Sequence, residues 1–114
     1  DCRIAAGTAD FTTGPAMTRA QAVQAIAAGI ALVRAQKQSG AQLLATGEMG
    51  IGNTTTSSAV LAVLLDAPVE TVTGRGGGVT DEAFARKKAV IQKAIAINAP
   101  DAARDFPTQD CTAK

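Results

Sequence analysis

The hydrophobic core of this chain has to be built almost entirely from small and branched aliphatic side chains. Alanine supplies 25 of the 114 residues and phenylalanine three, while tryptophan and tyrosine are absent. Hydrophobic residues still make up 46% of the chain and charged residues 18%, which is too apolar for disorder. Small side chains fill a core only where the backbone segments approach closely. We therefore expect residues 1–114 to form a single domain or the core fragment of a larger one.

The residue types missing from the chain exclude several kinds of active site. Without histidine there is no Ser-His-Asp triad, no Cys-His pair and no histidine metal site. Without tryptophan or tyrosine there is no base-stacking surface, and a net charge of +1 gives no basic field for a polyanion. Acid–base chemistry would have to use Asp, Glu, Lys or Cys. We expect no nucleic-acid partner, no metal and no cofactor.

Cysteine usage and hydropathy indicate a cytoplasmic protein with no membrane partner. Cys2 and Cys111 lie at opposite ends without CxxC spacing, which favours a reducing compartment over a disulfide scaffold. No apolar run approaches the roughly 20 residues that span a bilayer, and no basic-then-apolar signal segment opens the chain. Because the chain starts at Asp1 in a strand-like segment, we expect it to be a piece of a longer protein.

The order of predicted elements is typical of an α/β protein. Residues 3–9 and 41–46 are short apolar segments with the pattern of buried strands. Residues 53–65 are apolar nearly all the way round, which predicts a helix deep in the core, and residues 69–73 are predicted to be extended. The alternation of strands and helices predicts a three-layer, Rossmann-like α/β fold with a parallel sheet and crossover helices.

Two amphipathic helices have clear local signals at their ends. Thr18 and Gln21 form a capping box at the start of the first helix, and Gly40 supplies its C-terminal stop. Thr80 or Asp81 caps a helix that runs to about Asn98. The apolar arc of this last helix is expected to comprise Ala83, Phe84, Val90, Ile91, Ala94, Ile95 and Ile97.

The segment GEMGIGNT at residues 47–54 has the physical features of a phosphate site. It shares the GxxxxG frame of a P-loop, but Asn53 stands where that motif has its lysine. Glycines let the backbone approach an anion, and the following helix N-terminus presents free N–H groups. A phosphate would therefore fit this segment. A tight turn whose hydroxyls only cap the helix explains the frame equally well.

Lys87 is the candidate for the cation that the glycine segment lacks. It falls in the middle of the apolar arc of residues 81–98, where an unpaired ammonium costs several kcal/mol. It therefore needs an anion or an escape to water along its own stem. Lys88, on the flank of that arc, is expected to be an ordinary solvated residue.

Two further features are candidates for contacts with the same ligand. GRGGG at residues 74–78 exposes backbone at Gly74 and Gly76 and brings Arg75 as a second cation, although a plain flexible connector is the alternative. Glu48 would repel a phosphate unless it faces sugar hydroxyls or a cation. A ribose beside the phosphate would account for it.

Three spaced motifs resemble one enzyme family. ATGEMGIGNTTTSSAV, with GTADFTTGPAMT upstream and GRGGGVTDEAFARKKAV downstream, is similar to nicotinate-nucleotide:dimethylbenzimidazole phosphoribosyltransferase, over nearly the whole chain but only a central part of that enzyme. The resemblance implies transfer of phosphoribose from nicotinate mononucleotide to dimethylbenzimidazole, with inversion at the anomeric carbon and release of nicotinate. The product, α-ribazole phosphate, belongs to the synthesis of the lower ligand of cobalamin.

The resemblance also implies roles for individual residues. It places the phosphate on Gly50, Gly52, Asn53 and Thr54, with Lys87 as the cationic partner, and Glu48 beside the ribose as a secondary carboxylate. It places the principal general base outside this chain, and it implies a homodimer. A phosphate- or mononucleotide-binding fragment without catalysis, and a structural fragment with an empty loop, are the alternatives.

Overall fold

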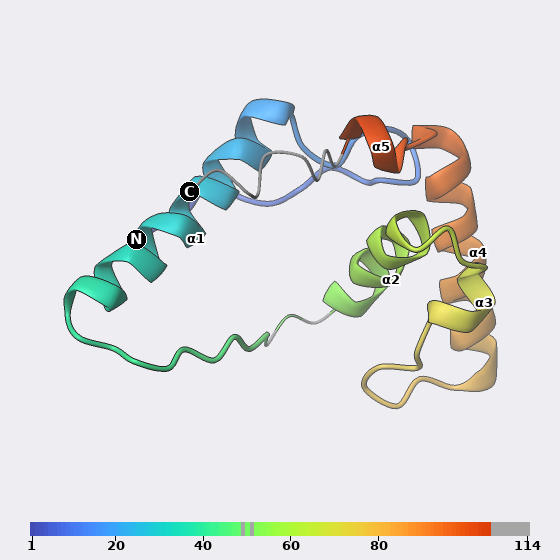
Figure 1. Cartoon of the computed structure of the whole chain (residues 1–114). Helices are drawn as coiled ribbons and strands as arrows, with labels where there is room; N and C mark the ends of the chain where they lie inside the picture. The colour runs from blue at the N-terminus through green and yellow to red at the C-terminus, as the bar shows by residue number, and fades with distance from the viewer. Residues whose placement is uncertain (49, 51, 106–114) are drawn as a thin grey trace. The chain divides into compact units, whose positions relative to one another are not determined.

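A computed structural model of the chain describes residues 1–48, 50 and 52–105 (Figure 1). Its helices belong to two compact units. The first unit comprises Asp1–Asp10 and Pro15–Met49, and the second comprises Phe11–Gly14 and Gly50–Lys114. The expectation of a single domain over the whole chain stays a prediction.

The first unit contains α1 (Arg19–Gln38), whose ends lie where the sequence predicts them. Thr18 Oγ1 accepts a hydrogen bond from Gln21 N at 3.2 Å, and Gln21 Oε1 accepts one from Thr18 N at 2.8 Å. Ser39 is the C-cap, and Gly40 follows in the left-handed region with a φ of +92°. The capping box and the glycine stop are therefore confirmed.

No residue of α1 is buried. The large apolar side chains that give the helix its periodicity are all exposed: Val23, Ile26, Ile30, Leu32 and Val33. The capping box and the glycine stop therefore fix the limits of α1 without burial of any of its residues. The predicted amphipathic spacing is present without the core contact that usually accompanies it.

The two segments predicted as strands have no strand structure. Residues 3–9 and 41–46 are irregular, and no residue in the described ranges 1–48, 50 and 52–105 is assigned to a strand. Leu43 and Leu44 in the second segment are 89% and 48% exposed. A strand exists only through hydrogen bonds to a neighbouring strand. The three-layer, parallel-sheet Rossmann-like α/β fold therefore stays a prediction.

The second unit packs α2 (Asn53–Leu64), α3 (Val69–Val72) and α4 (Asp81–Asn98) against one another, and α5 (Ala102–Asp105) follows them (Figure 1). Its core consists of Ala59, Ala62, Val69 and Ile91, with Phe11, Val72 and Ile95 packed around them. Two of the four central residues are alanines of α2, so the backbones of α2 and α4 can approach closely. The predicted small-residue core is confirmed for this unit.

Burial of α2 differs from the prediction. Ser58, Ala59 and Ala62 are buried, whereas Val60, Leu61 and Leu64 are 45%, 42% and 47% exposed. The expectation of a helix deep in the core is wrong for the described chain, because α3 and α4 cover only one face of α2. The limits of the helix agree with the prediction to within one residue.

Residues 69–73 were expected to be extended, and this expectation is wrong, because Val69–Val72 form the short helix α3. Pro68 stands directly before the helix, where its missing N–H is not needed. Thr71 donates from both N and Oγ1 to Pro68 O, at 3.0 and 2.7 Å. Val69 is buried in the core of the unit. The bonds to Pro68 O and the burial of Val69 thus override the strand preference of the β-branched residues.

The ends and most of the apolar face of α4 agree with the prediction. Thr80 is the N-cap, and its Oγ1 accepts from Ala83 N at 3.3 Å. Ile91 and Ala94 are buried, but Ile97, which was expected in the arc, is 47% exposed. Asn98 donates from Nδ2 to Phe11 O at 2.8 Å. This bond ties residues 11–14 to the second unit.

We expect Ile91→Ala to destabilise the second unit far more than Ile97→Ala. Ile91 is 0% exposed and Ile97 is 47% exposed, and the two residues share one helix. Truncating a fully buried isoleucine costs about 2–5 kcal/mol, whereas a half-exposed one should cost less than about 1 kcal/mol. Urea unfolding followed by circular dichroism measures both. Similar losses in the two variants would contradict the core described above.

Candidate functional site

The ammonium of Lys87 joins three segments that are distant in the sequence. Lys87 lies on α4 and is half-buried. Its Nζ donates to Thr54 Oγ1 on α2 at 2.8 Å and to Gly74 O in the loop before α4 at 2.8 Å. These partners are 33 and 13 residues away along the chain. The structure therefore brings together the lysine and two of the candidate ligand segments that the sequence singled out.

Within the described part of the chain, no carboxylate forms an ion pair with Lys87. Arg75 and Asp81 form the ion pair found in residues 1–48, 50 and 52–105. Both recorded partners of the Lys87 ammonium are neutral oxygens, and a lysine has three N–H groups to donate. These two bonds use two of the three N–H groups of the ammonium. The sequence left open an anionic partner or an escape to water for this ammonium. The structure shows a third arrangement, in which neutral oxygens accept its hydrogen bonds beside α2.

The N-terminus of α2 has no side-chain cap. Gly52 is the N-cap, in the left-handed region with φ +84°, and no side-chain cap bond is formed among the described residues. Asn53 N and Thr55 N donate instead to Gly50 O and Gly52 O, both at 3.1 Å. Thr56 Oγ1 donates back to Asn53 O at 3.0 Å. The N-terminal N–H groups of a helix carry a partial positive charge when they are not capped. The alternative in which the hydroxyls of this segment cap the helix is therefore not what the structure shows.

Gly76 lets the loop before α4 touch Thr54. Its φ is +70°, and a Cβ added there would lie 2.9 Å from Thr54 Oγ1 and 3.6 Å from Lys87 Nζ. Gly78, also left-handed at φ +84°, donates from N to Gly76 O at 2.9 Å. A side chain at position 76 would push the loop away from the ammonium. This close approach therefore requires a glycine at position 76.

A shallow depression of about 260 Å³ lies beside the bond between Lys87 and Thr54. It is lined by residues of α2 and of the glycine loop: Thr54, Ser57, Ser58, Leu61, Gly74 and Gly76. The surface of this lining is mainly apolar. The cation, the uncapped helix end and the depression together form a place for a small anionic group.

Arg75 and Lys88 do not have the surroundings expected of them. The Arg75 guanidinium pairs with Asp81, donates to Val79 O at 3.3 Å and lies 4.9 Å from the centroid of the Phe84 ring. Lys88 is half-buried, with its ammonium 4.1 Å from the same centroid. The prediction of a solvated Lys88 is wrong, because the lysine packs on an aromatic ring.

The remaining candidates are Gly50, Asn53 and Glu48. Gly50 O accepts from Asn53 N at 3.1 Å, so both residues belong to the turn that starts α2. Glu48 is exposed, lies in an irregular segment and belongs to the first unit. Its expected position beside a ribose stays a prediction. Sequence reasoning missed Asp81 and Phe84 as partners of Arg75, although an acid placed just beyond a glycine loop that contains an arginine is a readable signal.

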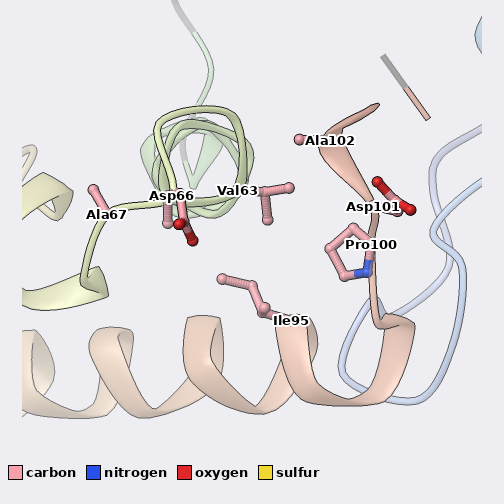
Figure 2. A pocket seen from close by; sticks show the side chains of 8 residues that line it. Val63, Asp66, Ala67, Ile95, Pro100, Asp101 and Ala102 are labelled. Atoms are coloured by element: carbon pink, nitrogen blue, oxygen red, sulfur yellow. The ribbon is translucent and has the colours of Figure 1, made fainter. Parts of the chain in front are cut away.

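A second depression lies at the other end of α2 (Figure 2). It has a volume of about 560 Å³ and is lined by Ala62, Val63, Asp66, Ala67, Ile95, Pro100, Asp101 and Ala102. Figure 2 shows Ile95 pointing from α4 toward Asp66 and Val63. None of the candidate site residues lines this second depression.

Neither a metal centre nor a membrane segment is found in the described part of the chain. Within residues 1–48, 50 and 52–105 there is no group of three or more Cys, Asp or Glu side chains placed to hold a metal ion. No helix in these ranges combines the length and apolarity needed to cross a bilayer.

We expect Gly76→Ala to disturb the site and Gly77→Ala to leave it intact. Alanine at 76 would take an unfavourable left-handed conformation and collide with Thr54 Oγ1, whereas a Cβ at 77 meets nothing within 4 Å. The first change should cost about 1–3 kcal/mol in stability or displace the loop. Amide chemical shifts of Thr54 and Lys87, with urea unfolding, distinguish the two variants. Unchanged shifts in Gly76→Ala would show that the loop does not touch Thr54.

Comparison with known proteins finds similarity to one family of phosphoribosyltransferases. The phosphoribosyltransferase family DBI_PRT matches residues 1–112. Proteins named nicotinate-nucleotide–dimethylbenzimidazole phosphoribosyltransferase from Roseiflexus castenholzii and Desulforudis audaxviator are 55% and 54% identical to the chain over 101 residues, and the one from Geobacter sulfurreducens is 50% identical over 99. These alignments cover 87–89% of the chain but only 28–29% of the relatives. The chain, which spans less than a third of the length of these relatives, belongs to the DBI_PRT phosphoribosyltransferase family.

Proposed function

We propose that this chain holds the phosphoribosyl group in an enzyme that transfers it from nicotinate mononucleotide to dimethylbenzimidazole. The products are α-ribazole phosphate, used for the lower ligand of cobalamin, and nicotinate. Membership of the family and the names of relatives at 50–55% identity support this reaction. The observation that carries the binding role is the Lys87 ammonium, held by neutral oxygens of Thr54 and Gly74 and, among the residues that the structure describes, in no ion pair with a carboxylate.

A phosphate monoester fits the chemistry of this site. The dianion would receive a charge-assisted hydrogen bond from the Lys87 ammonium. It would also lie at the positive end of the α2 dipole, where Asn53 N and Thr55 N donate to Gly50 O and Gly52 O at 3.1 Å. Gly50, Gly52, Asn53 and Thr54 form the turn through which that helix begins. Gly74 and Gly76 would approach the ligand from the loop on the other side of the Lys87 ammonium. Thr54 Oγ1 can donate its own hydrogen to the phosphate while it accepts from Lys87.

The reaction itself requires positioning more than strong chemical activation. The bond from the anomeric carbon to the nicotinate ring nitrogen breaks, and the cationic ring leaves as a neutral ring with its carboxylate. A nitrogen of dimethylbenzimidazole forms the new bond from the opposite side, and a base takes its proton. The residues of this chain would fix the phosphoribosyl group, and Glu48 would lie near the ribose as a secondary carboxylate. The principal base lies outside these 114 residues.

Several further properties belong to the same proposal. We place the protein in the cytoplasm as a homodimer with two small-molecule substrates and without a cofactor. Residues 3–9 and 41–46 would be strands of a three-layer, Rossmann-like α/β fold. Their apolar runs suit a parallel sheet whose two faces are both covered by helices. The alternative function is a phosphate- or mononucleotide-binding fragment that lacks the general base.

Lys87→Ala should weaken binding of nicotinate mononucleotide and of inorganic phosphate by about 10- to 100-fold, because a charge-assisted hydrogen bond and a full charge are lost. Lys88→Ala is the matched control, since its ammonium lies over Phe84 and makes no recorded contact with Thr54 or Gly74. It should change affinity by less than about twofold. Isothermal titration calorimetry of the three chains measures the difference. Equal losses in the two variants, or no binding by the parent chain, would rule out the phosphate site.

Turnover separates the transferase from the binding-only alternative. In a chimera, these residues replace the matching segment of the Desulforudis audaxviator relative, with which they share 54% identity. Formation of α-ribazole phosphate by the chimera, and its loss in Lys87→Ala, would support the enzyme. A chimera that folds and binds nicotinate mononucleotide but forms no product would favour the binding-only fragment.

A further inference from the structure

The loop that contributes Gly74 O and Gly76 to the site should be difficult to hold in place. Four of the seven residues at positions 74–80 are glycines, and glycine loses more backbone freedom on ordering than any other residue. The site nevertheless depends on this loop, because Lys87 donates to Gly74 O and Gly76 lies against Thr54. Some contact outside the site has to restrict the loop.

Arg75 makes contacts that can restrict it. Its guanidinium pairs with Asp81, donates to Val79 O at 3.3 Å and lies 4.9 Å from the centroid of the Phe84 ring. Val79 is at the far end of the loop, and Asp81 is the first residue of α4. The side chain of Arg75 therefore closes the loop from its second residue onto the start of the helix that carries Lys87.

Local charges favour this closed arrangement. Asp81 lies in the first turn of α4, where a carboxylate is stabilised by the helix dipole. Thr80 caps the same helix through its hydroxyl, so the end of the loop is fixed. The planar guanidinium can pair with the carboxylate and also lie over a ring, which an ammonium does less well.

We propose that Arg75, acting through Asp81 and Phe84, is a positioning residue that orders the glycine loop and so sets the place of Gly74 O and Gly76 beside Lys87. It does not act as a second cation on the ligand. This inference rests on the proposed function for the identity of the ligand, but the ordering of the loop can be measured without any ligand. Exposed ion pairs contribute little individually, and these two side chains are 51% and 88% exposed. The expected effect on affinity is therefore moderate.

The sign of the effect of Asp81→Asn separates a positioning role from direct contact. If Arg75 touched the phosphate, removing the carboxylate would free its charge and tighten binding. A positioning residue predicts the opposite, with Asp81→Asn and Arg75→Met each weakening binding of nicotinate mononucleotide by about three- to tenfold. The double variant should be no weaker than the single ones, because both changes break the same contact. Glu82→Gln is the matched control, since it removes an acid from the same helical turn without breaking the pair.

Loop order in the free chain provides the second readout. Nuclear magnetic resonance relaxation of the amides of Gly76, Gly77 and Gly78 should show greater mobility in Arg75→Met and Asp81→Asn than in the parent chain. In Glu82→Gln the mobility of these amides should be unchanged. Tighter binding by Asp81→Asn, or unchanged loop order in both variants, would overturn the proposal. If the parent chain binds no ligand, the proposed function fails, and the relaxation data still decide whether Arg75 positions the loop.

Discussion

The hydrogen bonds of the Lys87 ammonium to Thr54 and Gly74 are the interaction on which the rest of the site depends. A lysine stem reaches Thr54 only because α2 and α4 lie close together, and they do so because Ala59 and Ala62 of α2 pack near Ile91. Larger residues at the two alanines would separate the helices. The alanine-rich composition is thus a condition for the site as well as for the core.

The parts of the structure that sequence reasoning predicted are those with a local cause. Thr18 and Thr80 cap their helices through bonds to residues three positions later, and those bonds are present. Lys87 was identified from its position on the face of one helix together with a lysine missing from a glycine frame. Both observations need only the spacing within a short segment. The structure then brings that lysine to Thr54 in the glycine segment, and its role toward a phosphate stays a prediction.

The parts that sequence reasoning could not predict depend on partners elsewhere in the chain. The segment 69–73 has β-branched residues, but the burial of Val69 against α2 and α4 decides in favour of α3. The surroundings of Arg75 depend on the path of a glycine-rich loop, which local rules do not determine. Strands at 3–9 and 41–46 require a pairing partner, so an apolar pattern alone does not produce them. The exposed face of α2 likewise depends on what covers it.

In the proposed function, phosphate binding and the chemistry at the ribose would depend on residues of different units. Thr54, Gly74, Gly76 and Lys87 all belong to the second unit and are held by its core and by the bonds of one ammonium. Glu48 belongs to the first unit. On this proposal, affinity for a phosphate would depend on the packing of α2, α3 and α4. The chemistry at the ribose would depend on carboxylates outside this packing. Changes in the core of the second unit should consequently alter phosphate affinity even where every catalytic carboxylate is intact.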